Sequence, residues 1–404
     1  MPDIARSGKH KSTASGDKGS VRVQSPSGRG LEAGWDGSHL YIRREGRFEV
    51  DPNGYFQFTY RGHAGPAAPS NDFIMRRVEL GIQGTLGQHY DFDFSVEASN
   101  LKISLYNADL QINYKPALQF KIGRFKEPFS REELTSSRYL EFAEREMVNN
   151  LVPGQGAGIM AQGFLFGRDV QYQLGIFGGK GPLAEKDSVT PDGVFRLRIT
   201  PWLSSSSRYL RGMTFGSAFA DGRTTYGKSF LGSTASGSFV FFTQQAVNGA
   251  VTRENGEWAW LIGPAGFHAE YIQSQQDRHG LGSRGDNLPG ITAKGYYFST
   301  TYLITGENRV EDAQPVPHSP VFGSPRKGLG AWELKFRYST LHMSDGSERN
   351  QVNTFTPGLN WYLTRFVRIM LDLNVEVLAK PVVIPVPRPS GALLSALVTT
   401  QFRF

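Results

Sequence analysis

Cysteine is absent from this 404-residue chain, which excludes disulfide bridges, thiol catalysis and Cys-ligated zinc. Long apolar runs are absent as well. No stretch reaches the roughly 18 apolar residues that a transmembrane helix requires, so a helical membrane protein is excluded. A membrane β-barrel is compatible with this lack, because strands of about 9–11 residues with every second side chain apolar leave the overall hydropathy of a soluble protein.

Glycine and aromatic residues are abundant instead. The chain contains 47 Gly, and 12% of its residues are aromatic. This composition suits a protein with many turns and with aromatic girdles at the two membrane interfaces. It favours a barrel over a soluble β-protein without deciding between them.

A basic tail rich in Ser and Gly opens the chain. Residues 1–30 hold six Lys and Arg against two Asp, a net charge of +4 out of the chain's +7. A segment of this composition buries too little apolar surface to fold, so we expect residues 1–34 to be a disordered basic extension. Such a tail can also touch anionic lipid or nucleic acid, but we predict no nucleic-acid partner.

The same tail shows no apolar core of a signal peptide. An outer-membrane location therefore requires that the signal was removed, replaced by a tag or lost through a misplaced start codon.

Strict alternation of apolar and polar residues marks residues 366–378. Val367, Ile369 and Leu371 begin one face, while Arg368 and Asp372 lie on the other. The alternation is longer than the strands of about five or six residues that dominate soluble sheets. It is typical of a tilted membrane strand.

The chain also ends in an alternating segment, residues 393–404. Val398, Phe402 and Phe404 share one face, and Gln401 and Arg403 share the other. We expect the first three to face lipid and the last two to face the bore at the periplasmic rim.

Similar segments recur along the whole chain. In chain order the sixteen predicted strands are 54–61, 72–86, 89–98, 106–115, 118–125, 158–167, 169–178, 193–200, 211–220, 252–263, 266–275, 291–304, 330–341, 352–362, 366–378 and 393–404.

The connections between these segments alternate in length, as they do in bacterial barrels. The long ones are 126–157, 179–192, 221–251, 276–290 and 379–392. Two connections on the expected short-turn rim, 201–210 and the Pro-rich 305–329, are nevertheless long.

Residues 120–158 read FKIGRFKEPFSREELTSSRYLEFAEREMVNNLVPGQGAG. With segments 263–272, 295–309, 330–338 and 358–373, this sequence resembles the phosphate-selective porin O and P family. The start of the chain's ordered part, 35–60, is also similar to the family's entry into its first strand. The resemblance covers most of residues 35–404.

The resemblance implies an all-β, 16-stranded antiparallel transmembrane β-barrel in the bacterial outer membrane, usually a homotrimer, in which the third loop folds into the bore. We therefore predict a barrel domain at 35–404, with a short N-terminal hairpin at 35–53 and a constriction loop at 126–157. The family's last strand pairs with its first, so 393–404 should lie beside 54–61. Outer-membrane lipid and small permeant anions such as phosphate are the expected partners.

The constriction loop has helical spacing between Arg131 and Asn150, and Ser130 with Glu133 forms a plausible capping box. We expect a short helix there. The basic residues predicted to line the constriction or the anion path are Lys126, Arg131, Arg138 and Arg145 on the loop, and Lys121, Arg196, Arg198 and Arg337 on the strands.

Selectivity in a pore comes from the charges at its narrowest point, and here the two signs nearly balance. The polar strand faces carry eight basic residues, Arg77, Lys121, Arg196, Arg198, Lys335, Arg337, Arg368 and Arg403. They also carry nine acidic ones, Glu79, Asp91, Asp93, Glu97, Asp109, Glu270, Glu333, Asp372 and Glu376. The loop adds four basic and six acidic residues. Arg196 and Arg198 lie two apart on one face, about 6.6–6.8 Å along the strand, close enough for one anion to meet both, although the favoured interpretation is that these arginines pair with inward carboxylates and hold the loop against the wall.

The sequence thus leaves two channels open, an anion or phosphate-selective one and a general mixed-charge diffusion porin. A lipid-hydrolysing barrel enzyme and a soluble carbohydrate-binding β-protein are the rivals from other classes. His279 and Ser283 share a loop without a nucleophile motif, and the other histidines show no metal-ligand spacing. We therefore predict no enzyme activity, no cofactor and no metal.

Overall fold

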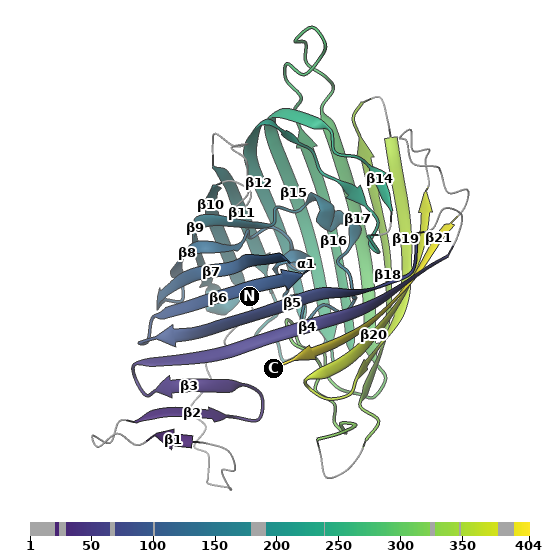
Figure 1. Ribbon diagram of the computed structural model, residues 1–404. Helices are drawn as coiled ribbons and strands as arrows, with labels where there is room; N and C mark the ends of the chain where they lie inside the picture. The colour runs from purple at the N-terminus through teal and green to yellow at the C-terminus, as the bar shows by residue number, and fades with distance from the viewer. Residues whose placement is uncertain are drawn as a thin grey trace.

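The computed structural model describes residues 21–23, 30–64, 69–99, 102–178, 191–237, 239–323, 328–346, 349–378 and 392–404. In this part of the chain sixteen antiparallel strands form a closed barrel (Figure 1), which confirms the predicted fold class. The barrel strands are β4 (Phe48–Ala64), β5 (Asp72–Leu86), β6 (Tyr90–Ser99), β7 (Lys102–Lys115), β8 (Leu118–Lys126), β9 (Gln155–Leu165), β10 (Val170–Gly178), β11 (Asp192–Ile199), β12 (Met213–Lys228), β15 (Ala246–Ile262), β16 (Ala265–Gln276), β17 (Ile291–Leu303), β18 (Ala331–Ser344), β19 (Arg349–Tyr362), β20 (Val367–Leu378) and β21 (Ala392–Arg403).

The last strand closes the barrel on the first, as expected. β21 pairs with β4 from Leu394↔Ala64 to Arg403↔Tyr55. Inside the bore, the Gln57 amide donates to Gln401 Oε1 at 2.7 Å. Over the described residues this seam closes the wall at membrane depth, where an unpaired backbone group would cost several kcal/mol.

The alternation of side chains also follows the prediction. Phe402 is 37% exposed on the outer face, whereas Gln401 is fully buried in the bore. Val398 and Phe404 share the exposed face of Phe402, and Arg403 lies against the Tyr139 ring inside the barrel. The outside of the barrel is therefore apolar and its interior polar.

One predicted loop, 221–251, is wrong. β12 continues to Lys228 and β15 begins at Ala246, and the two strands pair as far as Lys228↔Ala246. The connection shrinks to 229–245 and contains the short strands β13 (Gly232–Ser233) and β14 (Val240–Phe242). Residues 221–228 lack apolar alternation, so backbone pairing extends this hairpin where no periodic pattern reveals it.

The N-terminal hairpin begins earlier than the predicted boundary at residue 35. β2 (Leu31–Trp35) pairs with β3 (Leu40–Arg44) and with β1 (Val21–Val23), so residues 31–34 belong to the hairpin and not to the extension. A five-residue strand is too short for its periodicity to stand out. The rest of the predicted extension, residues 1–20 and 24–29, lies outside the described residues.

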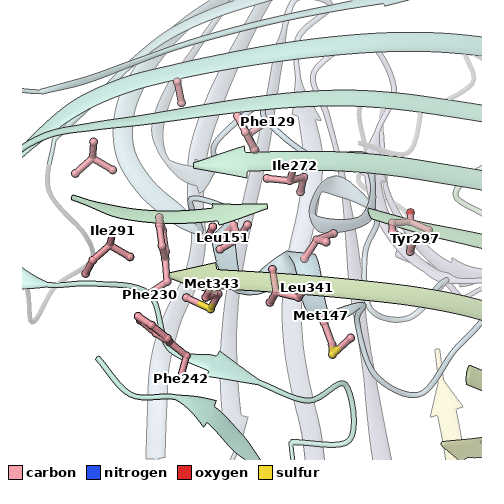
Figure 2. Packing of buried hydrophobic residues seen from close by; sticks show 14 of the residues in the cluster. Phe129, Met147, Leu151, Phe230, Phe242, Ile272, Ile291, Tyr297, Leu341 and Met343 are labelled. Carbon is pink, nitrogen blue, oxygen red and sulfur yellow. The ribbon is translucent and has the colours of Figure 1, made fainter. Parts of the chain in front are cut away.

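The interior of the barrel holds two inward-folded connections. Phe129, Met147 and Leu151 of the loop 127–154 pack with Phe230 and Phe242 of the connection 229–245. Figure 2 shows this cluster against Ile272, Ile291, Tyr297, Leu341 and Met343 of the wall. A hydrophobic core therefore fills one side of the bore and fixes both connections inside it.

Helices are few and short in the described part of the chain. It contains α1 (Arg131–Leu134) and two 3-10 segments, η1 (Met147–Leu151) and η2 (Phe166–Arg168). Among the described residues, no helix has the length and apolar character needed to cross a membrane.

The two faces of strand β10 give a direct test of the barrel orientation. Leu174 is 56% exposed on the outer face, whereas Gln171 lines the internal cavity described below. We expect Leu174→Arg to lower the free energy of unfolding by about 2–4 kcal/mol, because the guanidinium would enter the lipid. Guanidinium titration of the protein in lipid vesicles, followed by Trp fluorescence, measures this.

The matched control is Gln171→Arg on the same strand. Its new charge faces the water of the cavity but lies opposite Arg198 across the sheet, so we expect a loss of no more than about 1 kcal/mol. Equal losses for the two variants would contradict the assignment of faces.

Candidate pore constriction

The loop 127–154 is anchored to the wall through the first turn of α1. The backbone N–H of Arg131 donates to Glu257 Oε2 at 3.1 Å, and that of Glu132 donates to Glu270 Oε1 at 2.7 Å. Two wall carboxylates thus satisfy amides that have no partner within the helix. They hold the start of the loop against β15 and β16.

The predicted cap is confirmed in part. Ser130 Oγ accepts from the Glu133 N–H at 3.3 Å and itself donates to Glu270 at 2.7 Å. The Glu133 carboxylate instead pairs with Arg145, so the capping box has only its first half.

The predicted helix over Arg131–Asn150 is wrong beyond Leu134. Basic side chains take the carbonyl groups that a continuing helix would use for its own hydrogen bonds. Arg145 donates to the carbonyls of Glu132 and Thr135, and further basic donors occupy those of Leu140, Glu141 and Glu144. The loop is therefore held by the wall and by its own charges.

A cavity of about 1640 Å³ lies between this loop and the short-turn rim. Six of the eight basic residues predicted from the sequence line it: Lys121, Lys126, Arg131, Arg138, Arg196 and Arg198. The structure thus brings most of the predicted set around one space.

Arg145 and Arg337 are not among the residues that line this cavity. Arg145 contacts Glu133 Oε2 at 3.2 Å, and Arg337 donates to the Glu144 carbonyl at 3.1 Å and lies 4.3 Å from the centre of the Phe142 ring. Both side chains hold the loop in place without lining the cavity. They differ in this respect from the other predicted residues.

The strand residues of the predicted set are paired with carboxylates. Lys121 Nζ lies 2.8 Å from Asp109 Oδ1, and Arg196 contacts Glu257 and donates to Gln173 Oε1 at 3.0 Å. Because both partners of the Arg196–Glu257 pair are buried, breaking it by removing one partner costs about 3–5 kcal/mol.

The loop residues are held in a similar way. Arg138 contacts Glu79 Oε1 at 3.2 Å, Lys126 donates to the Thr135 carbonyl at 3.1 Å, and Arg131 lies 3.0 Å from His268 Nε2. A protonated guanidinium can only donate, so His268 accepts this bond. Arg131 and Lys126 are thus fixed largely by neutral acceptors.

The charges around the cavity nearly cancel. Ten Lys and Arg side chains line it, against nine Asp and Glu side chains. The balance counted along the strands in the sequence therefore persists around this cavity. A permeant ion meets a mixed-charge surface.

A third inward segment in the described part of the chain, which sequence reasoning missed, comes from the connection 304–330 between β17 and β18. Arg309 is buried between Glu141 of the loop and Glu333 of β18, with Arg309 Nη1 3.1 Å from Glu333 Oε1. Burial opposes ionisation of Glu141, but the guanidinium groups of Arg309 and Arg131 outweigh it and lower the pKa of that carboxyl to about 2. The segment is thereby locked onto the constriction loop by charge.

Further along the same segment, Asp312 Oδ1 accepts from Thr135 Oγ at 3.0 Å and Gln314 accepts from Gln401 at 3.3 Å. Glu311 and Asp312 line the cavity. The length of this connection on the short-turn rim was the signal that could have revealed it, since a rim turn has no need of so many residues. Likewise, the three aromatic residues Phe230, Phe241 and Phe242 in the connection 229–245 are a signal that could have revealed its inward packing.

One group of described residues could hold a metal ion, although the sequence predicted none. His39, Glu49 and Asp51 bring their ligand atoms within 4.8 Å of one another at the edge of the cavity. His279, considered above beside Ser283, contacts Asp277 at 3.0 Å.

A closed barrel with an apolar outer wall, a polar bore and an inward-folded loop defines an outer-membrane channel. The sequence model of the family described as "Phosphate-selective porin O and P" matches residues 53–374. The chain therefore belongs to that family and is an outer-membrane channel protein.

One curated relative is Porin O of Pseudomonas aeruginosa, which is 23% identical over 389 residues, with 84% of each chain covered.

Solved structures agree on the fold. OmpT of Vibrio cholerae aligns with a TM-score of 0.59 at 10% identity, covering 90% of this chain and all of that one. An anion-selective porin from Comamonas acidovorans aligns with a TM-score of 0.57 at 13% identity, covering 89% and 100%. At such identities these structures support the architecture alone. Together, family and fold are those of a channel rather than an enzyme.

The buried pair of Arg196 on β11 and Glu257 on β15 provides a test of what stabilises the wall behind the loop. We expect Glu257→Gln to lower the free energy of unfolding by about 3–5 kcal/mol, because the Arg196 charge would stay buried without its counter-ion. Differential scanning calorimetry of the detergent-solubilised protein measures the loss.

Glu254→Gln is the matched control, since Glu254 lies on the same strand in an exposed position and should leave the unfolding temperature nearly unchanged. If Glu257→Gln were as stable as this control, the Arg196–Glu257 pair would not stabilise the folded barrel.

Proposed function

We propose that the channel passes small hydrophilic solutes and ions by diffusion, with weak selectivity between anions and cations, and that phosphate is one permeant anion among several. The observation that carries this proposal is the near balance of ten basic and nine acidic side chains around the cavity. Ion selectivity follows the net charge that a permeant ion meets at close range. A bore whose cations are mostly paired offers little net field.

An anion-selective or phosphate-selective channel is the second candidate. It is favoured by the family's description and by the gathering of Lys126, Arg131 and Arg138 with Arg196 and Arg198 around one cavity. Arg131 supports it most directly, because its nearest acceptor, His268, carries no formal negative charge. The two candidates differ in the strength of the anion preference.

Planar-bilayer recordings of the wild-type protein separate the candidates. We expect a small reversal potential under a KCl gradient and little effect of millimolar phosphate on the chloride current. A large anion-selective potential with block by phosphate would establish the second candidate instead.

The same recordings place the constriction. Lys126→Glu or Arg131→Glu should raise the ratio of cation to anion permeability by roughly fivefold or more, because one unit charge at 4 Å is worth about 1 kcal/mol even in water. Arg208→Glu, on the exposed turn after β11, is the control and should change nothing. An unchanged reversal potential in the loop variants would show that the loop does not line the ion path.

We also propose that the protein assembles as a homotrimer. The family resemblance supports this, and one solved neighbour, OmpT of Vibrio cholerae, is described as a trimer form. Exposed apolar side chains such as Ile159, Ile176 and Phe195 on the outer wall could meet either lipid or a neighbouring copy. Light scattering of the detergent-solubilised protein should give three copies per particle, and a single copy would contradict the proposal.

A further inference from the structure

A carboxylate from the inward segment 304–330 lies between two arginines of the bore. Glu311 Oε1 is 3.8 Å from Arg131 Nε, and Glu311 Oε2 forms a close ion pair with Arg198 Nη2. Arg131 comes from the constriction loop and Arg198 from β11, and all three side chains line the cavity. Glu311 thus holds two guanidinium groups from different walls at one point.

The contact with Glu311 does not satisfy every hydrogen-bond donor of Arg131. Its Nη2 is bonded to His268 at 3.0 Å, while its Nε is buried and has no hydrogen-bond partner. The 3.8 Å separation from Glu311 is too long for a hydrogen bond. One donor of the site therefore points at an anionic group without being satisfied by it.

Glu311 is tethered on both sides by contacts that do not involve its own carboxylate. Arg309 is locked between Glu141 and Glu333, and Gln314 accepts from Gln401 at 3.3 Å. The carboxylate is therefore held in the bore by its segment. Glu311 is 30% exposed and Arg198 is 24% exposed, so an ion in the cavity can reach the pair.

A carboxylate presents two oxygens to guanidinium groups in much the same way as a phosphate does. We propose that Arg131 and Arg198 form an oxyanion-binding subsite of the bore and that the Glu311 carboxylate is its resident, competing ligand. Glu311 then sets how strongly the channel binds a permeant oxyanion such as inorganic phosphate. This inference rests on the proposed channel function and deepens it.

The test is Glu311→Gln in the full-length protein, recorded in planar bilayers with inorganic phosphate as the probe. Glutamine keeps the size and the acceptor oxygen of the side chain but removes its charge. We expect the ratio of anion to cation permeability to rise roughly fivefold, the effect of one unit charge at about 4 Å in water. Half-block of the chloride current should occur at a phosphate concentration lower by a similar factor.

Asp312→Asn is the matched control. Asp312 lies next in the chain and lines the same cavity, but its carboxylate accepts from Thr135 instead of pairing with an arginine. It should leave phosphate block unchanged. If the two variants changed phosphate block equally, Glu311 would act only as one more negative charge in the cavity. That outcome would overturn the subsite.

The double variant Glu311→Gln with Arg198→Gln tests the subsite from its other side. In this double variant the phosphate concentration that half-blocks the chloride current should rise back to the wild-type value. If it stayed as low as in Glu311→Gln alone, the proposal would be overturned. An unaltered phosphate response in Glu311→Gln, with normal wild-type conductance and an unchanged circular dichroism spectrum, would also overturn it while leaving the channel function intact. Absence of any wild-type conductance would instead defeat the proposed function itself.

Discussion

Backbone N–H and C=O groups at membrane depth have no water to bond to, so each must find its partner within the protein. In this chain the pairing of β21 with β4 meets that requirement for the last open edges of the wall. Once the wall is closed, alternation along every strand sends one set of side chains to lipid and the other into an enclosed bore. The polarity of the interior is thus a consequence of closure.

An enclosed polar bore in turn determines what a loop can do inside it. The loop 127–154 brings backbone carbonyls and carboxylates into a space lined by arginines and lysines. These basic side chains donate hydrogen bonds to the loop's carbonyls and pair with its carboxylates, in place of the hydrogen bonds of a helix. Lys335, for example, donates to the Glu141 carbonyl at 2.8 Å while it also pairs with Asp372. Charges that position the loop are for that reason only partly available to a passing ion, which limits how selective the bore can be.

The parts of this structure that repeat were readable from the sequence. Period-two alternation located all sixteen strands, because each strand separates lipid from water over many residues and leaves a long pattern. Alternation failed for residues 221–228, where the strand continues without an apolar face. It also failed for the constriction loop, because helical spacing of apolar residues does not report that Arg145 and Arg337 will bind the loop's carbonyls.

The candidate site was predictable in composition and not in detail. Six of the eight basic residues do meet around one cavity, since their strand positions and the loop place them on the inner face. Several of their partners lie far away in the sequence. Arg198 meets Glu311 across 113 positions, and nothing local in the Pro-rich connection distinguishes Glu311 from any other acidic residue of a turn.

The N-terminal hairpin has a consequence for the accuracy of barrel closure. β3 pairs with β4 at Phe48–Val50, and β21 occupies the same edge from Tyr55 onward. A slip of β21 by two residues would keep every side chain on its proper face, so hydrophobic patterning alone does not forbid it. The hairpin of β2 and β3 is held by Arg365 at the Gly37 carbonyl and by the packing of Trp35 on Phe366. Its strand β3 occupies the edge of β4 up to Val50 and so limits such slips in one direction. The hairpin therefore limits the registers in which β21 can pair with β4 to close the barrel.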